Sequence, residues 1–201
     1  MRSLVTFAVV MGAVALLTAG CGLAPGDFGT ADDTPVTSEK PFAAGGAITL
    51  DLSGGAYVVR ASADARIHVA TSGHTGNTKV DISTGDRTAT VKVSDTPKNN
   101  FHATIDIPRA SDTSIHLSAG EITIDPIAGN LDVDSAAGNV TIGVSDPKDY
   151  SSVTASVKAG DLKAEPFGGS KSGLMQNFNW TGPGKRSLRA SLVAGNLVIR
   201  E

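Results

Sequence analysis

Apolar and polar residues alternate along most of the chain after residue 46. The clearest runs are 47–52 (AITLDL), 88–93 (TATVKV) and 103–107 (ATIDI). Period-two alternation with many Thr, Val and Ile residues is typical of strands that bury one face. No window in this part has the 3.6-residue period of a helix, so the pattern predicts an all-β domain over 47–201.

A short motif recurs within this alternation: a small residue, a glycine, a polar residue, an apolar residue, any residue, and an apolar or small residue. Its copies lie at 119–124, 128–133, 137–142, 159–164 and 194–199, with a fainter copy at 54–59. The first three glycines are 9 residues apart. That spacing fits one strand and one corner, taken twice per coil of about 18 residues. Glycine suits such corners because it tolerates positive φ without a Cβ clash.

The recurring corner favours a β-solenoid, in which each coil stacks on the previous one. The apolar residues of the motif would then form ladders inside the stack. They are Ile122, Ile124, Leu131, Val133, Val140, Ile142, Leu162, Leu197 and Ile199. A β-sandwich of hairpins remains the alternative, since it has the same alternation and turn residues but does not require a recurring corner.

The start of the chain has the plan of an export signal. Arg2 precedes an apolar stretch from Leu4 to Leu17, and small residues at 18–20 precede Cys21. The apolar run is shorter than the roughly 20 residues that a membrane span needs. Residues 17–21 (LTAGC) resemble the bacterial lipobox, in which the cysteine is acylated and the chain is cut just before it. We therefore expect a signal peptide at 1–20 and a lipid such as palmitate on Cys21, which would hold the protein at the extracytoplasmic face of the cell membrane.

Residues 21–46 are expected to hold the lipidated cysteine and a flexible linker. This segment contains Pro25, Pro35 and Pro41 with several Gly and Ala, and it has no apolar periodicity. Such a composition favours an unstructured tether. The predicted organisation is thus a signal peptide (1–20), a lipidated linker (21–46) and one β-strand-repeat domain (47–201).

Composition narrows the range of partners. The chain has 17 Lys and Arg against 20 Asp and Glu, scattered along its length, and a formal net charge of −3. Nucleic-acid binding needs a basic patch, so we expect no nucleic-acid partner. Cys21 is the single cysteine. No intramolecular disulfide can therefore form.

Two stretches resemble a known family. Residues 105–108 (IDIP) lead into 114–120 (SIHLSAG), and the last repeat begins at 194–197 (AGNL). These residues are similar to those of the putative-adhesin family of bacterial β-strand-repeat domains, over about 47–201. The resemblance implies a single-sheeted or solenoid-like all-β fold at the cell surface, and it carries over no catalytic residue.

The polar positions between the apolar ladders are expected to form two outward rows. The first row is Glu121, Asn130, Asn139, Asp161 and Asn196; the second is Asp125, Asp134, Gly143, Glu165 and Arg200. Stacked carboxylates offer acceptors to a glycan or a cation, which makes Asp125, Asp134 and Glu165 candidate binding residues. The Asp-rich nonapeptide of calcium-binding solenoids is absent, so a solvated face is the preferred interpretation and no metal or other cofactor is predicted.

The longest gap in the repeat, 166–185, contains Phe178 and Trp180, the latter being the only tryptophan. On a projecting loop these aromatic side chains could bind a sugar or a protein partner. Alternatively, the segment caps the open end of the stack.

These patterns predict a lipid-anchored binding or structural module of the cell envelope that is not an enzyme and that contacts an envelope polymer or protein. One alternative is a β-helix enzyme acting on envelope polysaccharide, with Asp132, Asp134 and Lys163 in a groove. The other is an envelope assembly or stress factor acting through protein contacts.

Overall fold

The computed structural model describes residues 34–201, which form 13 strands joined in one sheet. The strands, in chain order, are β1 (Thr37–Pro41), β2 (Ala47–Leu52), β3 (Gly55–Ser62), β4 (Arg66–Gly73), β5 (Lys79–Thr84), β6 (Thr88–Ser94), β7 (Phe101–Pro108), β8 (Asp112–Leu117), β9 (Gly120–Ile124), β10 (Leu131–Gly143), β11 (Tyr150–Ala164), β12 (Gly169–Thr181) and β13 (Arg186–Arg200). Two 3-10 turns, η1 (Pro147–Asp149) and η2 (Glu165–Phe167), precede β11 and β12. The all-β prediction is confirmed. The predicted signal peptide and Cys21 lie outside the described residues.

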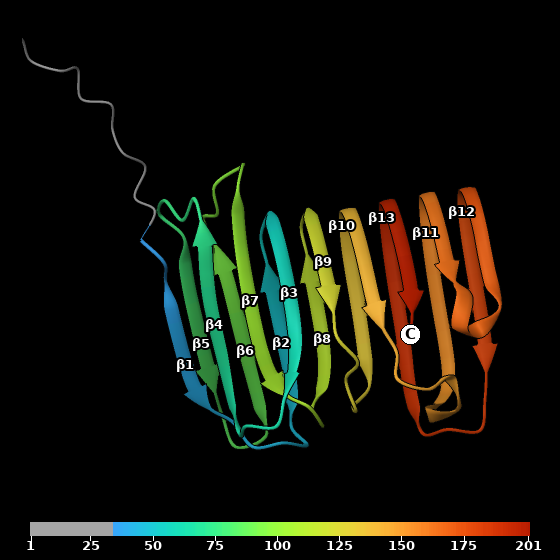
Figure 1. Cartoon of the computed structure of the whole chain (residues 1–201), viewed down its shortest axis with the longest axis horizontal. Helices are drawn as coiled ribbons and strands as arrows, with labels where there is room; N and C mark the ends of the chain where they lie inside the picture. The colour runs from blue at the N-terminus through green and yellow to red at the C-terminus, as the bar shows by residue number, and fades with distance from the viewer. Residues whose placement is uncertain (1–33) are drawn as a thin grey trace, which may run out of the picture.

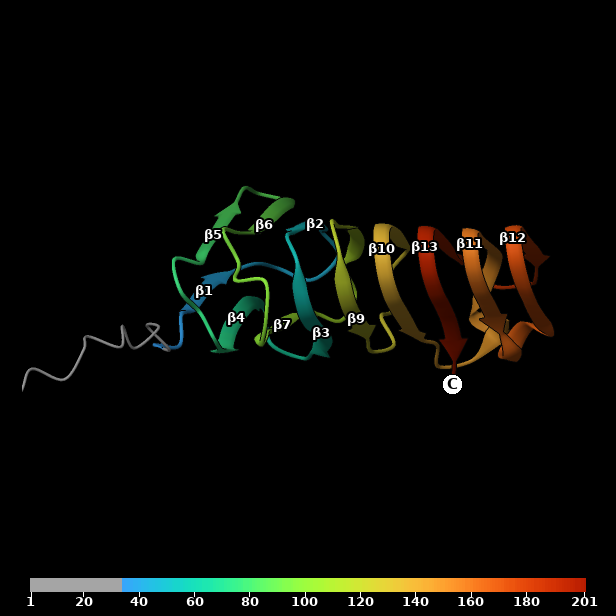
Figure 2. The same ribbon diagram turned by 90° about the horizontal axis from the view of Figure 1, so that it is seen from above.

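The sheet folds over on itself into two facing layers (Figures 1 and 2). The long strand β10 shows how this happens: its residues 131–135 pair with β8, whereas residues 138–142 pair with β9. We call layer 1 the layer of β5, β6, β2, β8 and the first arms of β10, β13 and β11. Layer 2 contains β1, β4, β7, β3, β9 and the second arms of the same long strands.

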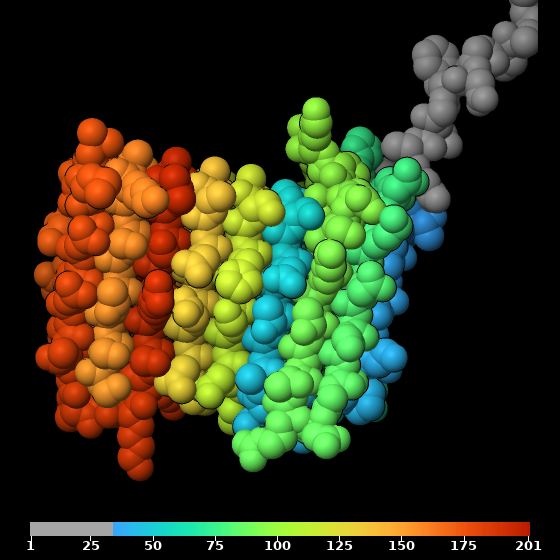
Figure 3. All heavy atoms as spheres, turned by 180° about the vertical axis from the view of Figure 1, so that it is seen from behind, coloured from blue at the N-terminus to red at the C-terminus, as the bar shows by residue number. Residues whose placement is uncertain are grey.

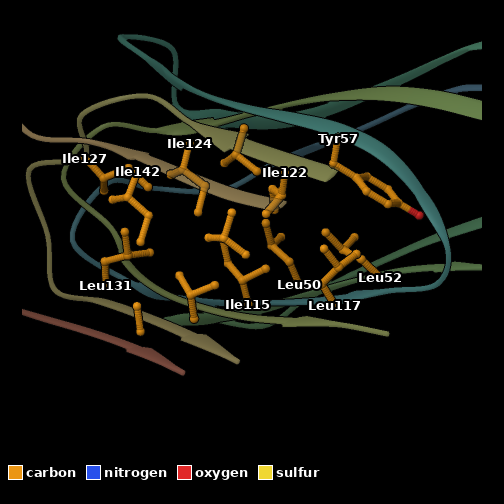
Figure 4. Close-up of a cluster of buried hydrophobic side chains, with 14 of the residues drawn as sticks. Leu50, Leu52, Tyr57, Ile115, Leu117, Ile122, Ile124, Ile127, Leu131 and Ile142 are labelled. Atoms are coloured by element: carbon orange, nitrogen blue, oxygen red, sulfur yellow. The ribbon is translucent and has the colours of Figure 1, made fainter. Parts of the chain in front are cut away.

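One apolar core fills the space between the layers (Figure 4). Ile122, Leu131 and Val140 all lie in it, with 1%, 6% and 1% of their surfaces exposed. Their burial follows from the alternation, because successive side chains of a strand point to opposite faces. The predicted apolar interior is confirmed.

Six glycines stand in register along one edge, where the chain passes between the layers. They are Gly55, Gly120, Gly138, Gly195, Gly160 and Gly173, in spatial order. Gly138 has φ +123°, and a Cβ there would lie 1.7 Å from the carbonyl oxygen of Gly120. Gly129 is at the opposite edge, where a Cβ would lie 2.2 Å from the Ser111 carbonyl oxygen. The 9-residue spacing thus alternates between two edges.

The stacking does not follow the order of the chain. The strand β3 lies between β7 and β9, and β10 neighbours β13 rather than β11. The prediction that each coil stacks on the previous one is therefore wrong. The motif could not reveal this, because every copy offers the same glycine corner and apolar ladder to its neighbour. Two layers around one core are also compatible with the sandwich alternative.

The folded domain begins before the predicted boundary at Ala47. Residues of β1 pair with β4, and Phe42 is buried in the core, so the last part of the predicted 21–46 linker belongs to the sheet. The alternation missed β1 because this short edge strand is almost wholly exposed. Within 34–201, no helix has the length and apolar character to span a membrane.

Candidate binding surface

The outer face of layer 1 carries two adjacent depressions of about 500 and 480 Å³. Figure 3 looks onto this face, on which the strands run side by side. We define the layer 1 face by six residues that line the depressions: Asp51, Ser114, His116, Asp132, Asp134 and Arg189. Each occupies an outward position of a strand whose alternate residues form the core.

One row on the outer side of layer 1 alternates between acidic and basic residue types across five strands, and three of its members belong to the layer 1 face. Its members are Asp81, Lys92, Asp51, His116 and Asp134, each in register with the next. Neighbouring strands lie about 4.8 Å apart, so each of the three inner members has a residue of the opposite type on either side. His116 Nδ1 is 3.9 Å from Asp134 Oδ2. The row fixes polar groups of both signs on a rigid backbone.

A second row runs parallel to the first through Ser114, Asp132 and Arg189. Arg189 Nε is 4.0 Å from Asp132 Oδ1, which is too far for a hydrogen bond. Asp132 Oδ1 is screened from solvent and has no hydrogen-bond partner. A buried carboxylate oxygen without a hydrogen-bond donor is unfavourable, and the nearby Arg189 guanidinium partly offsets this cost.

The predicted first row is largely present on layer 2. Asn139 donates from Nδ2 to Glu121 Oε1 (3.1 Å), and Asn196 donates from Nδ2 to Asn139 Oδ1 (3.0 Å). Asp161 continues this ladder beside Asn196. Asn130 does not belong to it, because Asn130 lies at the opposite edge and accepts hydrogen bonds from Ser187.

The predicted second row is divided between the layers. Asp134 lies on layer 1 beside His116, whereas Gly143 and Arg200 are paired on layer 2. Asp125 follows β9 on layer 2, and Glu165 opens η2 after β11. The row assumed that a residue 9 positions further on returns to the same face, but 9 residues lead to the other layer.

Phe178 and Trp180 do not lie on a projecting loop. They belong to β12, which pairs with β11 along its whole length at one end of the stack (Figure 1). Both are partly buried against the core, and Trp180 packs on Phe167 with ring centroids 4.8 Å apart. Wide spacing in the repeat indicated a loop, whereas the segment is a strand that runs antiparallel and so lacks the motif's order. Its packing is that of a cap.

The three residues of the imagined catalytic groove are not brought together. Asp132 and Asp134 lie on the first arm of β10 in layer 1, and Lys163 lies on the second arm of β11 in layer 2. Within residues 34–201, no three His, Cys, Asp or Glu side chains are close enough to share a metal ion.

A different ionic cluster, which the sequence did not single out, lies on layer 2. Arg60 donates from Nε and Nη2 to the carboxylate of Asp106 (2.8 and 3.2 Å), and His68 Nδ1 lies 3.3 Å from the same carboxylate. This cluster joins β3, β7 and β4. The sequence could not indicate it because His68, Arg60 and Asp106 meet only through the pairing of distant strands.

Asp132 and Asp134 were candidates from the sequence, but the other residues that line the layer 1 depressions were not. Asp51, Lys92 and Arg189 each stand at an outward position of a recognisable alternating strand. The sequence therefore predicts that these side chains point outward. It does not predict the strand order that brings them side by side.

No protein-family model matches the sequence, and no curated relative matches it. The crystal structure of a putative cell adhesion protein from Clostridium sporogenes is similar, with a TM-score of 0.51 and 14% sequence identity, over 83% of this chain and 99% of that chain. That of a putative adhesin from Bacteroides fragilis has a TM-score of 0.34 and 10% identity, over 85% of this chain and 99% of that chain. The first likeness shows a shared fold alone, and the second is too weak to support an argument.

Proposed function

We propose that the domain is a non-catalytic binding module of the cell envelope, of the adhesin type, and that it binds an extended polymer across the strands of its layer 1 face. The observation that carries this proposal is the pair of adjacent depressions on that face, with their rows of polar side chains. Each row crosses several strands at about 4.8 Å per strand, which suits a ligand with regularly spaced hydrogen-bonding groups.

The chemistry of the face favours a partner rich in hydrogen-bond donors. Asp51, Asp112, Asp132 and Asp134 line the depressions, together with the cations Lys92 and Arg189. Carboxylates accept hydrogen bonds and do not donate them. Hydroxyl groups of a neutral glycan would supply donors to the partly exposed carboxylates of this face. An anionic polymer would be repelled by the excess of aspartates.

A binding role is also supported by the fold. The structure from Clostridium sporogenes that shares it is described as a putative cell adhesion protein. The resemblance of the motifs to the putative-adhesin family points the same way. Parallel, in-register corners further support classing the domain as a β-solenoid whose coils are reordered.

The test is titration of the chain carrying Cys21→Ser with neutral and anionic envelope polysaccharides. The double variant Asp132→Ala, Asp134→Ala should weaken binding of the neutral polymer at least about tenfold, because it removes acceptors from both rows. Lys163→Ala is the matched control, since it changes an exposed charge on layer 2, and it should bind like the parent. Equal binding by the double variant would reject the face, and release of shortened polymer would reject a non-catalytic role.

We further propose that lipid on Cys21 anchors this module to the membrane. The lipobox-like residues 17–21 support the anchor. Cys21→Ser should release the protein into the soluble fraction, because each buried acyl CH₂ contributes about 0.8 kcal/mol and stable anchoring needs the two or three chains that the cysteine would carry. Retention of the processed variant in washed membranes would contradict lipid anchoring.

A further inference from the structure

The strand β12 ends the stack and, within the described residues, pairs with β11 alone (Figure 1). Its outer edge crosses both layers, since its pairing with β11 runs from Gly169 to Thr181. An unpaired edge presents main-chain N–H and C=O groups to any other strand. Such edges normally require protection.

Side chains of β12 provide that protection at its bend. Four bonds run from side-chain nitrogens to carbonyl oxygens of the same strand: Gln176 Nε2 to Ser172 (3.1 Å) and to Leu174 (3.0 Å), Asn177 Nδ2 to Met175 (3.3 Å), and Lys171 Nζ to Asn177 (2.5 Å). Each of these bonds occupies one of the two lone pairs of a carbonyl oxygen at the bend. The side chains that make them therefore compete with a docking strand for these carbonyls and hinder strand addition at the bend.

The same bend would otherwise be suited to association. Leu174 and Met175 are the most exposed large apolar side chains of the described residues, at 76% and 69%. Lys171 is the only charged residue of β12. An edge with two exposed apolar side chains and so little charge is the kind that pairs with its own copy, because little like-charge repulsion opposes it.

The pairing of β11 with β12 shows what geometry a second copy would adopt. These two bent strands run antiparallel, with the corner glycines Gly160 and Gly173 in register. A second β12 could repeat this arrangement about a two-fold axis at the bend. A Cβ on Gly160 would lie 1.8 Å from the Gly195 carbonyl oxygen, whereas one on Gly173 would meet only Gln176 Nε2, at 3.4 Å. The place of the next strand is thus open except for the capping side chain.

We propose that the outer edge of β12 is an end-to-end docking edge for a second copy of this chain, held closed in the free domain by Lys171, Gln176 and Asn177. Displacing these side chains opens the bend. Two stacks then join through paired β12 strands, with Leu174 and Met175 of each copy packed beside those of the other along the seam.

Sedimentation of the full chain carrying Cys21→Ser, between about 1 and 100 µM, tests this proposal. The parent should be monomeric. Adding Lys171→Ala, Gln176→Ala and Asn177→Ala should produce a dimer within that range, at least about a tenfold gain in self-affinity. A parent that is already dimeric, or a triple variant that stays as monomeric as the parent, would overturn the proposal.

A second set of variants separates docking at this edge from general aggregation. Adding Leu174→Asp and Met175→Asp to the triple variant should restore the monomer, because like charges then face each other across the two-fold axis. Persistent association would overturn the assignment to this edge. Gln176→Met, which keeps the side-chain length and removes two of the four bonds, gives a milder form of the test. It should also increase the dimer fraction, and no increase would count against the proposal.

Discussion

At the scale of single residues, the glycine column sets the tightest constraint on the sequence. Gly138 has positive φ and no room for a Cβ, because the Gly120 carbonyl oxygen lies in the way. Gly168 also has positive φ, +77°, but nothing lies within 4 Å of its Cβ position. A substitution at Gly168 therefore tests backbone strain alone, whereas one at Gly138 tests backbone strain together with a steric clash.

Gly138→Ala should lower the free energy of unfolding by about 3 kcal/mol or more, since it adds a clash to the strained backbone. Gly168→Ala should cost only about 1–2 kcal/mol, from left-handed strain alone. Urea unfolding followed by circular dichroism compares them. Equal losses would mean that the corners are not stacked as described.

Tyr57 is a buried residue whose hydroxyl has no hydrogen-bond partner. Burial raises the pKa of Tyr57 well above its ordinary value near 10. The unfolded chain therefore releases this proton near pH 10 while the folded chain keeps it. The resulting stability is complete below about pH 10 and is lost as the pH rises above it.

Tyr57→Phe should leave the free energy of unfolding at pH 7 unchanged or raise it by up to about 1 kcal/mol, because no hydrogen bond is lost. It should also reduce the loss of stability between about pH 10 and 11. Unfolding measured at pH 7 and at alkaline pH checks both effects. A clear loss at pH 7 would show that the hydroxyl has a stabilising partner.

At the scale of elements, β12 acts as an end cap. Phe178 and Trp180 cover the core from this strand, and Trp180 packs on Phe167. Trp180→Ala should lower the free energy of unfolding by about 2 kcal/mol, less than for a fully buried aromatic residue. Leu174→Ala, on the same strand but exposed, should cost less than about 0.5 kcal/mol.

Polysaccharide binding by folded Trp180→Ala should be unchanged. Loss of polysaccharide binding would assign a ligand-binding role to the cap.

The elements were more predictable than their partners. Alternation at 47–52 and 103–107 identified β2 and β7, because burial of one face leaves a period of 2 in any half-buried strand. The exposed edge strand β1 leaves no such trace. The motif predicts the corner at Gly138. It does not predict that this corner stacks on Gly195 rather than on Gly160.

At the scale of the whole molecule, the proposed binding function depends on strand order. The layer 1 face exists because β10 places Asp132 and Asp134 beside β8 on one side and β13 on the other. Of the candidate binding residues, Asp134 alone falls on this face, while Asp125 and Glu165 follow the strand halves of layer 2. The local sequence predicts which residues of a strand point outward. It does not predict which residues of other strands lie beside them, because that depends on packing between distant segments.

Disulfide trapping of two cysteine pairs measures this strand order directly, in the chain carrying Cys21→Ser. Asn139 and Asn196 are neighbours on β10 and β13, while Asp161 lies one strand further away, on β11. Cysteines at 139 and 196 should crosslink rapidly under mild oxidation, because neighbouring strands bring their Cα atoms to about 5 Å. Cysteines at 139 and 161 should not, since two strand spacings exceed the roughly 7 Å limit for a disulfide. Efficient crosslinking of 139 with 161 but not with 196 would contradict the strand order and the proposed binding face built on it.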